Sequence, residues 1–364
     1  MAAPAPSPAR PYIGGQAVIE GVMMRSPKSF VVAVRRPEGG VAVREQAWET
    51  LWPKLGFLRW PVFRGAVVLA ESLHNGYSAL KFSAEHGMPE DGAAPRRPSP
   101  VQLLSFLLGA LVAGADADPV TPSPDPAPKK DSSSDMLGVA TVVMMLFFIG
   151  LPHLLTWALG RAVGPGLDTT TPWFHLVDGG FRIVVLVGYL AILSRTEDAK
   201  RLFAYHGAEH KVIWTYESQK ALTVENARPF TTRHPRCGTS FLFIVVGVAV
   251  ALHVALLPLL PRLHENELVN QLLLVLIKLP MAFPIAGIAY ELQRLSARPS
   301  CPAIVTWAMK PGIWLQGITT RPPDDAQLEV ALLSLGRALA REEGRPGATD
   351  GVKLYPDFAA AQAA

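Results

Sequence analysis

The sequence predicts an α-helical polytopic membrane protein with about four transmembrane helices and a small cytoplasmic α+β region near its N-terminal end. Three observations predict this class: four long apolar stretches, an uneven placement of Lys and Arg between them, and a short β-like pattern before them. Hydrophobic residues make up 49% of the 364-residue chain, and they are concentrated in the apolar stretches. A soluble enzyme would distribute them among amphipathic elements instead.

Four apolar stretches have the length of a membrane span, because about 20 helical residues cross roughly 30 Å of hydrocarbon. They cover residues 136–160, 176–194, 239–260 and 268–290. A fifth apolar stretch, residues 101–115, is shorter and is bounded by Pro-rich segments. We therefore expect it to form an interfacial or re-entrant helix rather than another span.

The placement of Lys and Arg predicts how these spans are oriented. These residues number 14 before residue 136, eight in residues 195–236 and eight after residue 290, but only one in each short connection. Cytoplasmic loops retain basic residues. We therefore expect a multi-pass protein of the bacterial inner (cytoplasmic) membrane, with both termini and residues 195–238 on the cytoplasmic side.

The segments outside the spans differ in composition. Residues 12–87 combine β-like runs, a hairpin around Pro37–Gly40 and an amphipathic helix over Val62–His86. In the cytoplasmic segment 291–341, a turn is expected at Pro311 and Gly312 and a helix over Asp324–Arg341. The remaining segments are predicted to be a linker, which contains the 101–115 helix, and two disordered ends: residues 88–135, 1–11 and 342–364.

The segment AYHGAEHK contains the first candidate site residues. On a helix, His206 and His210 lie one turn apart on the same face, so both imidazoles can reach one ion, and Glu209 sits beside them. This is the H-x-x-E-H order of inverted zincins, in which two His bind zinc and the Glu activates water. Such a short pattern is a weak signal on its own.

His234 and Cys237 strengthen this signal, because they lie in RHPRCGTSF directly before the third span. A neutral imidazole and a thiolate are common zinc donors. We therefore predict a divalent metal site of the zinc type at the cytoplasmic membrane face, with Glu209 as the catalytic base and four ligands: His206, His210, His234 and Cys237. If all four bind, the ion is structural; an open position would instead permit hydrolysis of a peptide, amide or lipid-linked substrate.

The same residues also have a structural interpretation. Imidazoles near a membrane interface bond to headgroups or carbonyls, and a Cys before a membrane helix is often a small buried hydrophobe. A separate signal is given by Asp178, Arg182 and Lys278, which lie inside predicted spans. Charges there face a protein interior or a wet cavity, and Asp178 with Arg182 is best interpreted as a structural pair.

Three function classes are compatible with these residues: a metal-dependent enzyme, a non-enzymatic membrane scaffold or assembly factor, and a transporter. The sequence contains no GxxxxGK[ST] phosphate loop, no G-x-G-x-x-G fingerprint and no G-x-S-x-G elbow. The expected partners are membrane lipids and a possible protein at the cytoplasmic face. Nucleic acid is not expected, because topology accounts for the basic residues.

Five separated motifs resemble those of the YqhQ-like bacterial membrane proteins. They are GGQAVIEGVMMR (14–25), RGAVVLAESL (64–73), YHGAEHK (205–211), LTVENARPFTTRHPRCGTSF (222–241) and PGIWLQGITTRPPDDAQLEVAL (311–332). The resemblance implies a polytopic membrane protein of uncharacterised role that is often labelled a predicted metal-dependent enzyme. It also implies that His206, Glu209 and His210 match the family's HGAEH, and that His234 and Cys237 match its HPRCG.

Overall fold

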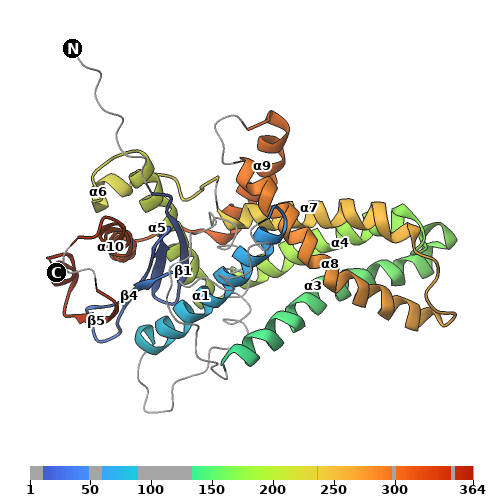
Figure 1. Ribbon diagram of the computed structural model, residues 1–364, viewed down its shortest axis with the longest axis horizontal. Helices are drawn as coiled ribbons and strands as arrows, with labels where there is room; N and C mark the ends of the chain where they lie inside the picture. Colours follow the sequence, from blue (N-terminus) through green and yellow to red (C-terminus); the bar gives the residue numbers. More distant parts are fainter. Residues whose placement is uncertain are drawn as a thin grey trace.

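The structure, a computed structural model, describes residues 11–48, 60–88, 133–235, 237–296, 301–345 and 349–363. A small sheet with helices packed on it forms one end of the molecule, and four long helices extend from that end as a bundle (Figure 1). The predicted 101–115 helix, nearly all of the 88–135 linker and residues 1–10 lie outside the described residues.

The sheet has five antiparallel strands in the order β1-β2-β3-β4-β5. Four strands come from the N-terminal region and one from the other end of the chain: β1 (Gly14–Val18), β2 (Gly21–Arg25), β3 (Ser29–Arg35), β4 (Val41–Ala47) and β5 (Gly351–Tyr355). The predicted hairpin around Pro37–Gly40 is confirmed and joins β3 to β4. Gly39 and Gly40 have φ angles of 98° and 81° there, which residues with a Cβ rarely adopt.

Helices cover both faces of the sheet, so its central strands are buried on both sides. In β3, Val31 and Ala33 pack against residues of α5 (Glu197–Glu217) and α10 (Asp325–Glu342). The alternating residue Val32 packs against α1 (Phe63–Gly87). The pleat of a strand sends successive side chains to opposite faces, which explains the continuous apolar run of β3.

Two predicted helices outside the spans are confirmed. The amphipathic helix expected over Val62–His86 is α1, and the helix expected over Asp324–Arg341 is α10. A capping box starts α10: the Asp324 carboxylate accepts from the Gln327 N–H at 2.8 Å, and the Gln327 side chain accepts from the Asp324 N–H at 3.0 Å.

The C-terminal tail differs from the expectation of disorder. β5 pairs with β4, with Val43 opposite Lys353, and α11 (Phe358–Ala363) packs on α10 through the fully buried Ala361. Arg337 of α10 donates to the Ala361 carbonyl at 2.7 Å and to the Tyr355 hydroxyl at 3.0 Å. The composition of the tail predicts disorder, because it does not show that β5 pairs with the edge of β4, which is distant in sequence.

The four predicted spans correspond to four long helices: α3 (Ser133–Val163), α4 (Pro172–Leu193), α7 (Gly238–Leu256) and α8 (Glu267–Ser296). Each contains a stretch that is long and apolar enough to cross a membrane. Only 22–33% of each such stretch is buried inside the protein, so the bundle presents apolar side chains outward. Such a surface requires an apolar environment, which a bilayer provides. Two short helical segments lie in the connections between bundle helices, η3 (Pro165–Leu167) and η4 (Leu257–Leu259), whereas α6 (Val224–Ala227) packs on α5 and α10 beside the sheet (Figure 1).

Helix α9 (Ala303–Thr319) runs through the predicted turn at Pro311 and Gly312, so that prediction is wrong. Pro removes one backbone N–H from a helix, but packing on a neighbouring element can keep the two halves together. The packing here is close, because a Cβ on Gly312 would lie 2.3 Å from the Ser240 Cα of α7. Gly312 therefore allows α9 to pack closely on α7. The C-terminal end of α9 also contacts α5, where the Thr319 carbonyl accepts from His206.

Removal of residues 345–364 should lower the melting temperature of the purified protein by several degrees, because it uncovers β4 and one side of α10. The measurement is thermal unfolding of the full-length and truncated chains in the same detergent. Arg337→Gln in the full chain removes the bonds to Tyr355 and Ala361 and the longer contact with Glu45 of β4 at 3.7 Å, but it leaves β5 paired with β4, so it should cause a smaller decrease. A truncated chain that melts with the full-length one would show that the tail adds no stability.

Candidate metal centre

Helix α5 carries three of the five predicted site residues. It begins after Thr196, whose side chain accepts a hydrogen bond from the Ala199 N–H, and its first turn is acidic, as helix N-termini favour. One side of α5, including Ala208, packs on the sheet. Another side approaches the chain that follows α9, because a Cβ on Gly207 would lie 2.0 Å from the Arg321 carbonyl oxygen.

The structure brings His206, His210 and Cys237 together. One donor atom of each lies within 4.8 Å of the others, and His206 Nε2 is 3.2 Å from Cys237 Sγ. The two imidazoles are one helical turn apart, with ring centres separated by 4.4 Å. Nitrogen and sulfur donors around a tetrahedral zinc ion lie about 3.5 Å apart, given the usual Zn–N and Zn–S bond lengths. These three residues could therefore hold a metal ion with small movements.

Backbone carbonyls orient both imidazoles. His206 Nδ1 donates to the Thr319 carbonyl at 2.8 Å, and His210 Nδ1 donates to the Thr232 carbonyl. Metal-binding histidines are held in this way, with the other ring nitrogen left as the ligand. Burial lowers the pKa of His210 well below its usual value, and the nearby imidazoles add to this effect, so the ring is neutral. Its Nε2 is buried and has no hydrogen-bond partner within the described residues.

Cys237 stands immediately before α7, and its carbonyl accepts from the Ser240 N–H at 3.0 Å. The positive end of a helix favours the thiolate form of a cysteine. Gln316 of α9 fixes the preceding loop, because its side chain accepts from the His234 N–H and donates to the His234 carbonyl, both at 2.8 Å. Sequence reasoning gave Gln316 no role, and its only signal was its place in the PGIWLQGITT motif.

His234 lies beside this cluster but does not join it. Its Nε2 is 3.4 Å from Glu217 Oε2, and its ring centre lies 4.7 Å from that of Trp214. Burial lowers the pKa of His234 to about 4, so the neutral ring donates to the Glu217 carboxylate. The ring centres of His234 and His210 are 5.8 Å apart. Of the four predicted ligands, the structure thus groups three.

Glu209 is buried between α5 and the first strand. A Cβ on Gly15 would lie 2.7 Å from Glu209 Cγ, so β1 passes directly over this side chain. Glu209 and residues of the cluster share one pocket with the chain that leads into β1, and its lining is Tyr12, Ile13, Gly14, Glu209, His210, Ile213, His234 and Cys237. Sequence reasoning gave residues 12–15 no role here, although a Gly pair in an apolar strand signals close backbone approach.

A family model described as a protein of unknown function, DUF1385, matches residues 60–341. The chain belongs to the DUF1385 family. The uncharacterized protein YqhQ of Bacillus subtilis (strain 168) is 32% identical to it over 338 residues, which cover 91% of this chain and 93% of that protein. The predicted resemblance to YqhQ-like proteins is therefore confirmed. No solved structure matches this DUF1385 chain.

Gly207→Ala should destabilise the DUF1385 chain, because the added methyl group would meet the Arg321 carbonyl oxygen. Overpacking of this kind costs about 1–3 kcal/mol and should appear as a lower melting temperature. Gly188→Ala on α4 is the matched control, since nothing lies within 4 Å of a Cβ at that position. Alanine is the better helix former, so the control should be neutral or slightly stabilised. Equal melting temperatures for the two variants would contradict the close approach of α5.

Proposed function

We propose that this chain is a metal-dependent membrane enzyme of the hydrolase type, with a zinc-type divalent ion held by His206, His210 and Cys237. The observation that carries the proposal is the buried Nε2 of His210, which lacks a partner in the described chain while its Nδ1 is bonded to a carbonyl. A buried polar atom without a partner is costly. A cation bound at this atom removes that cost.

The donor set fits such an ion. Two imidazole nitrogens and one thiolate are ligand types that zinc takes in proteins, and three protein ligands leave a position for water or substrate, as in catalytic sites. A bound zinc-type ion supplies Lewis-acid chemistry, which polarises a carbonyl and makes water easier to deprotonate. The proposal departs from the four-ligand prediction, because His234 borders the site and bonds to Glu217.

We assign Glu209 the role of general base. It is buried, it precedes His210 on α5, and it lines the same pocket as His210 and Cys237. In hydrolysis, a carboxylate here takes a proton from the attacking water as the water oxygen bonds to the substrate carbonyl carbon. It then delivers that proton to the leaving amine or alcohol. Gly15 lies directly against the Glu209 carboxylate, and Gly14 lines the same pocket.

The proposed substrates are peptides, amides or lipid-linked compounds at the cytoplasmic membrane face. The candidate metal centre lies where α7 begins and near the end of α9, at the junction of the bundle with the sheet. The basic segments of the chain flank this junction, which supports a cytoplasmic position for it. The protein is then a multi-pass inner-membrane protein with both termini in the cytoplasm.

Metal analysis tests the site directly. The full-length protein, purified without chelator, should contain close to one zinc-type ion per chain, and the His206→Ala/His210→Ala double variant should contain almost none. His234→Ala should keep most of the metal, because His234 lies outside the cluster. His264→Ala, in the exposed loop before α8, is the control for loss of a histidine as such. Equal, near-zero metal in the wild type and the double variant would end the proposal.

Glu209→Gln tests the reaction separately from metal binding. This variant should keep its metal but fail to restore the wild-type profile of membrane-associated peptides and lipids in a deletion strain. Untargeted mass spectrometry of those strains should reveal substrate and product that differ by one water. If Glu209→Gln restores the profile fully, the chain acts as a scaffold and Glu209 is not a base.

A further inference from the structure

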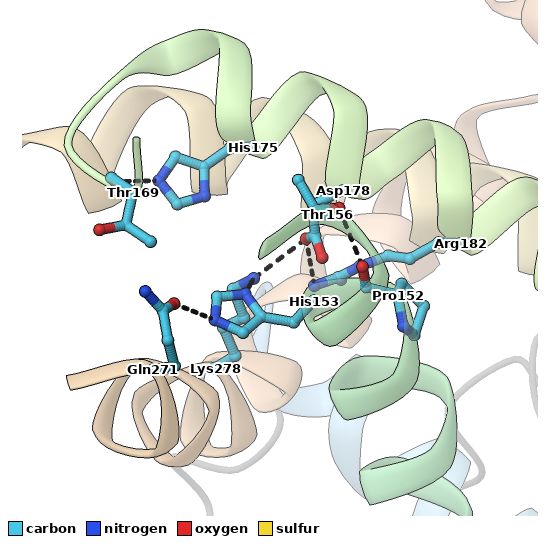
Figure 2. A network of polar contacts seen from close by, with 9 residues as sticks. All are labelled: Pro152, His153, Thr156, Thr169, His175, Asp178, Arg182, Gln271 and Lys278. Carbon is cyan, nitrogen blue, oxygen red and sulfur yellow. Dashed lines mark hydrogen bonds and ion pairs between the residues drawn. The ribbon is translucent and has the colours of Figure 1, made fainter. Parts of the chain in front are cut away.

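A second polar cluster lies inside the bundle, toward the end of the bundle away from the sheet (Figures 1 and 2). Asp178 and Arg182 project from α4, and Lys278 projects from α8. One carboxylate oxygen, Asp178 Oδ2, accepts from both cations: Arg182 Nη2 at 2.9 Å and Lys278 Nζ at 3.0 Å. The three side chains are 1%, 7% and 0% exposed, so water does not screen their charges.

Two histidines of the cluster add no positive charge. His153 Nε2 lies 2.9 Å from Gln271 Oε1, which only accepts, so His153 Nδ1 accepts from Lys278 Nζ at 2.8 Å and the ring is neutral. His175 Nε2 donates to the Thr169 carbonyl at 3.0 Å, and its Nδ1 has no hydrogen-bond partner within the described residues. A second proton on this buried ring would place a third positive charge beside Arg182 and Lys278, which is unfavourable.

The charges of the cluster do not balance. Asp178 contributes one negative charge, whereas Arg182 and Lys278 contribute two positive charges. In the described part of the chain, Asp178 is the carboxylate within ion-pair distance of both cations, and no second carboxylate pairs with either of them. Lys278 Nζ donates to Asp178 Oδ2 and His153 Nδ1, and the carboxylate at 3.0 Å favours the ammonium form, which has three protons to donate. An excess buried charge is costly without a counter-ion.

Several polar atoms around the excess charge also lack partners within the described residues. They are Arg182 Nε, Asp178 Oδ1, His175 Nδ1 and His253 Nε2. His253 of α7 interacts electrostatically with Arg182 and Lys278. Its helix touches α4 directly at this level, because a Cβ on Gly179 would lie 2.2 Å from Val250 Cγ2. Arg182 Nε always carries a proton, so at least one buried donor is left over beside the unbalanced charge.

The cluster lies close to one end of the bundle. Asp178 follows the start of α4 at Pro172 by six residues, which is about 9 Å of helix. The positive end of the α4 dipole lies on the same side and favours negative charge there. The candidate metal centre is at the opposite end of the bundle, so the two sites are separate (Figure 1).

We propose that this cluster binds one singly charged anion between Arg182 and Lys278. The anion is either a free halide ion or the phosphodiester of an anionic lipid headgroup. It neutralises the excess charge and accepts from the unpaired Arg182 Nε. Binding stabilises the folded bundle and holds α4 and α8 together.

The test is the melting temperature of the purified full-length protein at fixed ionic strength. In detergent, sodium chloride should raise it saturably relative to sodium gluconate, whose anion is large. In nanodiscs at low chloride, phosphatidylglycerol should raise it relative to phosphatidylcholine if the lipid headgroup is the ligand. A response in either arm supports the proposal and identifies the source. No response in both arms overturns it.

Two substitutions change the charge sum in opposite directions. Lys278→Met makes the sum zero and keeps the Asp178–Arg182 pair, so the anion response should disappear. Asp178→Asn makes the sum more positive, so the response should grow. Lys310→Met, on the exposed side of α9, removes a lysine outside the cluster and should respond like the wild type. If Asp178→Asn does not fold, the comparison of Lys278→Met with the wild type decides alone, and an unchanged response in Lys278→Met overturns the proposal.

Discussion

The close contact between α5 and the chain that follows α9 is the constraint on which the candidate metal centre depends. Phe203 accepts a hydrogen bond from the Arg321 N–H at 2.8 Å, and Gly207 leaves no room for a side chain against the Arg321 carbonyl. The contact places His206 and His210 within reach of carbonyls from two other segments. It also joins the sheet layer to the bundle, because α5 packs on the sheet while α9 packs on α7.

The two polar clusters are held together by different kinds of interaction. At the candidate metal centre, neutral main-chain groups hold the side chains, and a buried nitrogen atom is left without a partner. In the bundle, three charged side chains pair with one another, and one positive charge and one buried donor, Arg182 Nε, are left over. A shell of carbonyls orients a ligand without contributing net charge. A buried set of ions is stable only when its charges are compensated.

Local patterns in the sequence were sufficient for much of the fold. The four apolar helices, the β3–β4 hairpin, α1 and α10 each follow from length, periodicity or turn residues within one segment. The HGAEH spacing predicted the pairing of His206 and His210, because helix geometry alone sets it. Cys237 also lies in the cluster, as expected for a donor on the short segment that leaves the bundle after α4 and returns to it at α7.

The features that sequence reasoning missed depend on contacts between distant segments. Composition does not show that Gly15 covers Glu209, that Gln316 fixes the His234 backbone, or that β5 completes the sheet. His234 has the residue type of a ligand, but the structure places its ring against Glu217 and Trp214 and outside the group of three donors. Pro311 and Gly312 formed a typical turn signal, and the packing of α9 on α7 overrode it.

The sheet also sets an order of events during synthesis. Strands β1 to β4 leave the ribosome first, but α10 begins at Asp325 and β5 at Gly351. At about 5–20 residues per second, nearly 280 residues separate the end of β4 from α10 by roughly a quarter of a minute to a minute. During that time the four long apolar helices are made, while the β4 edge and the part of the sheet face that α10 covers stay without their partners. The apolar side chains that α10 covers are therefore exposed to non-native contacts until the last part of the chain is made.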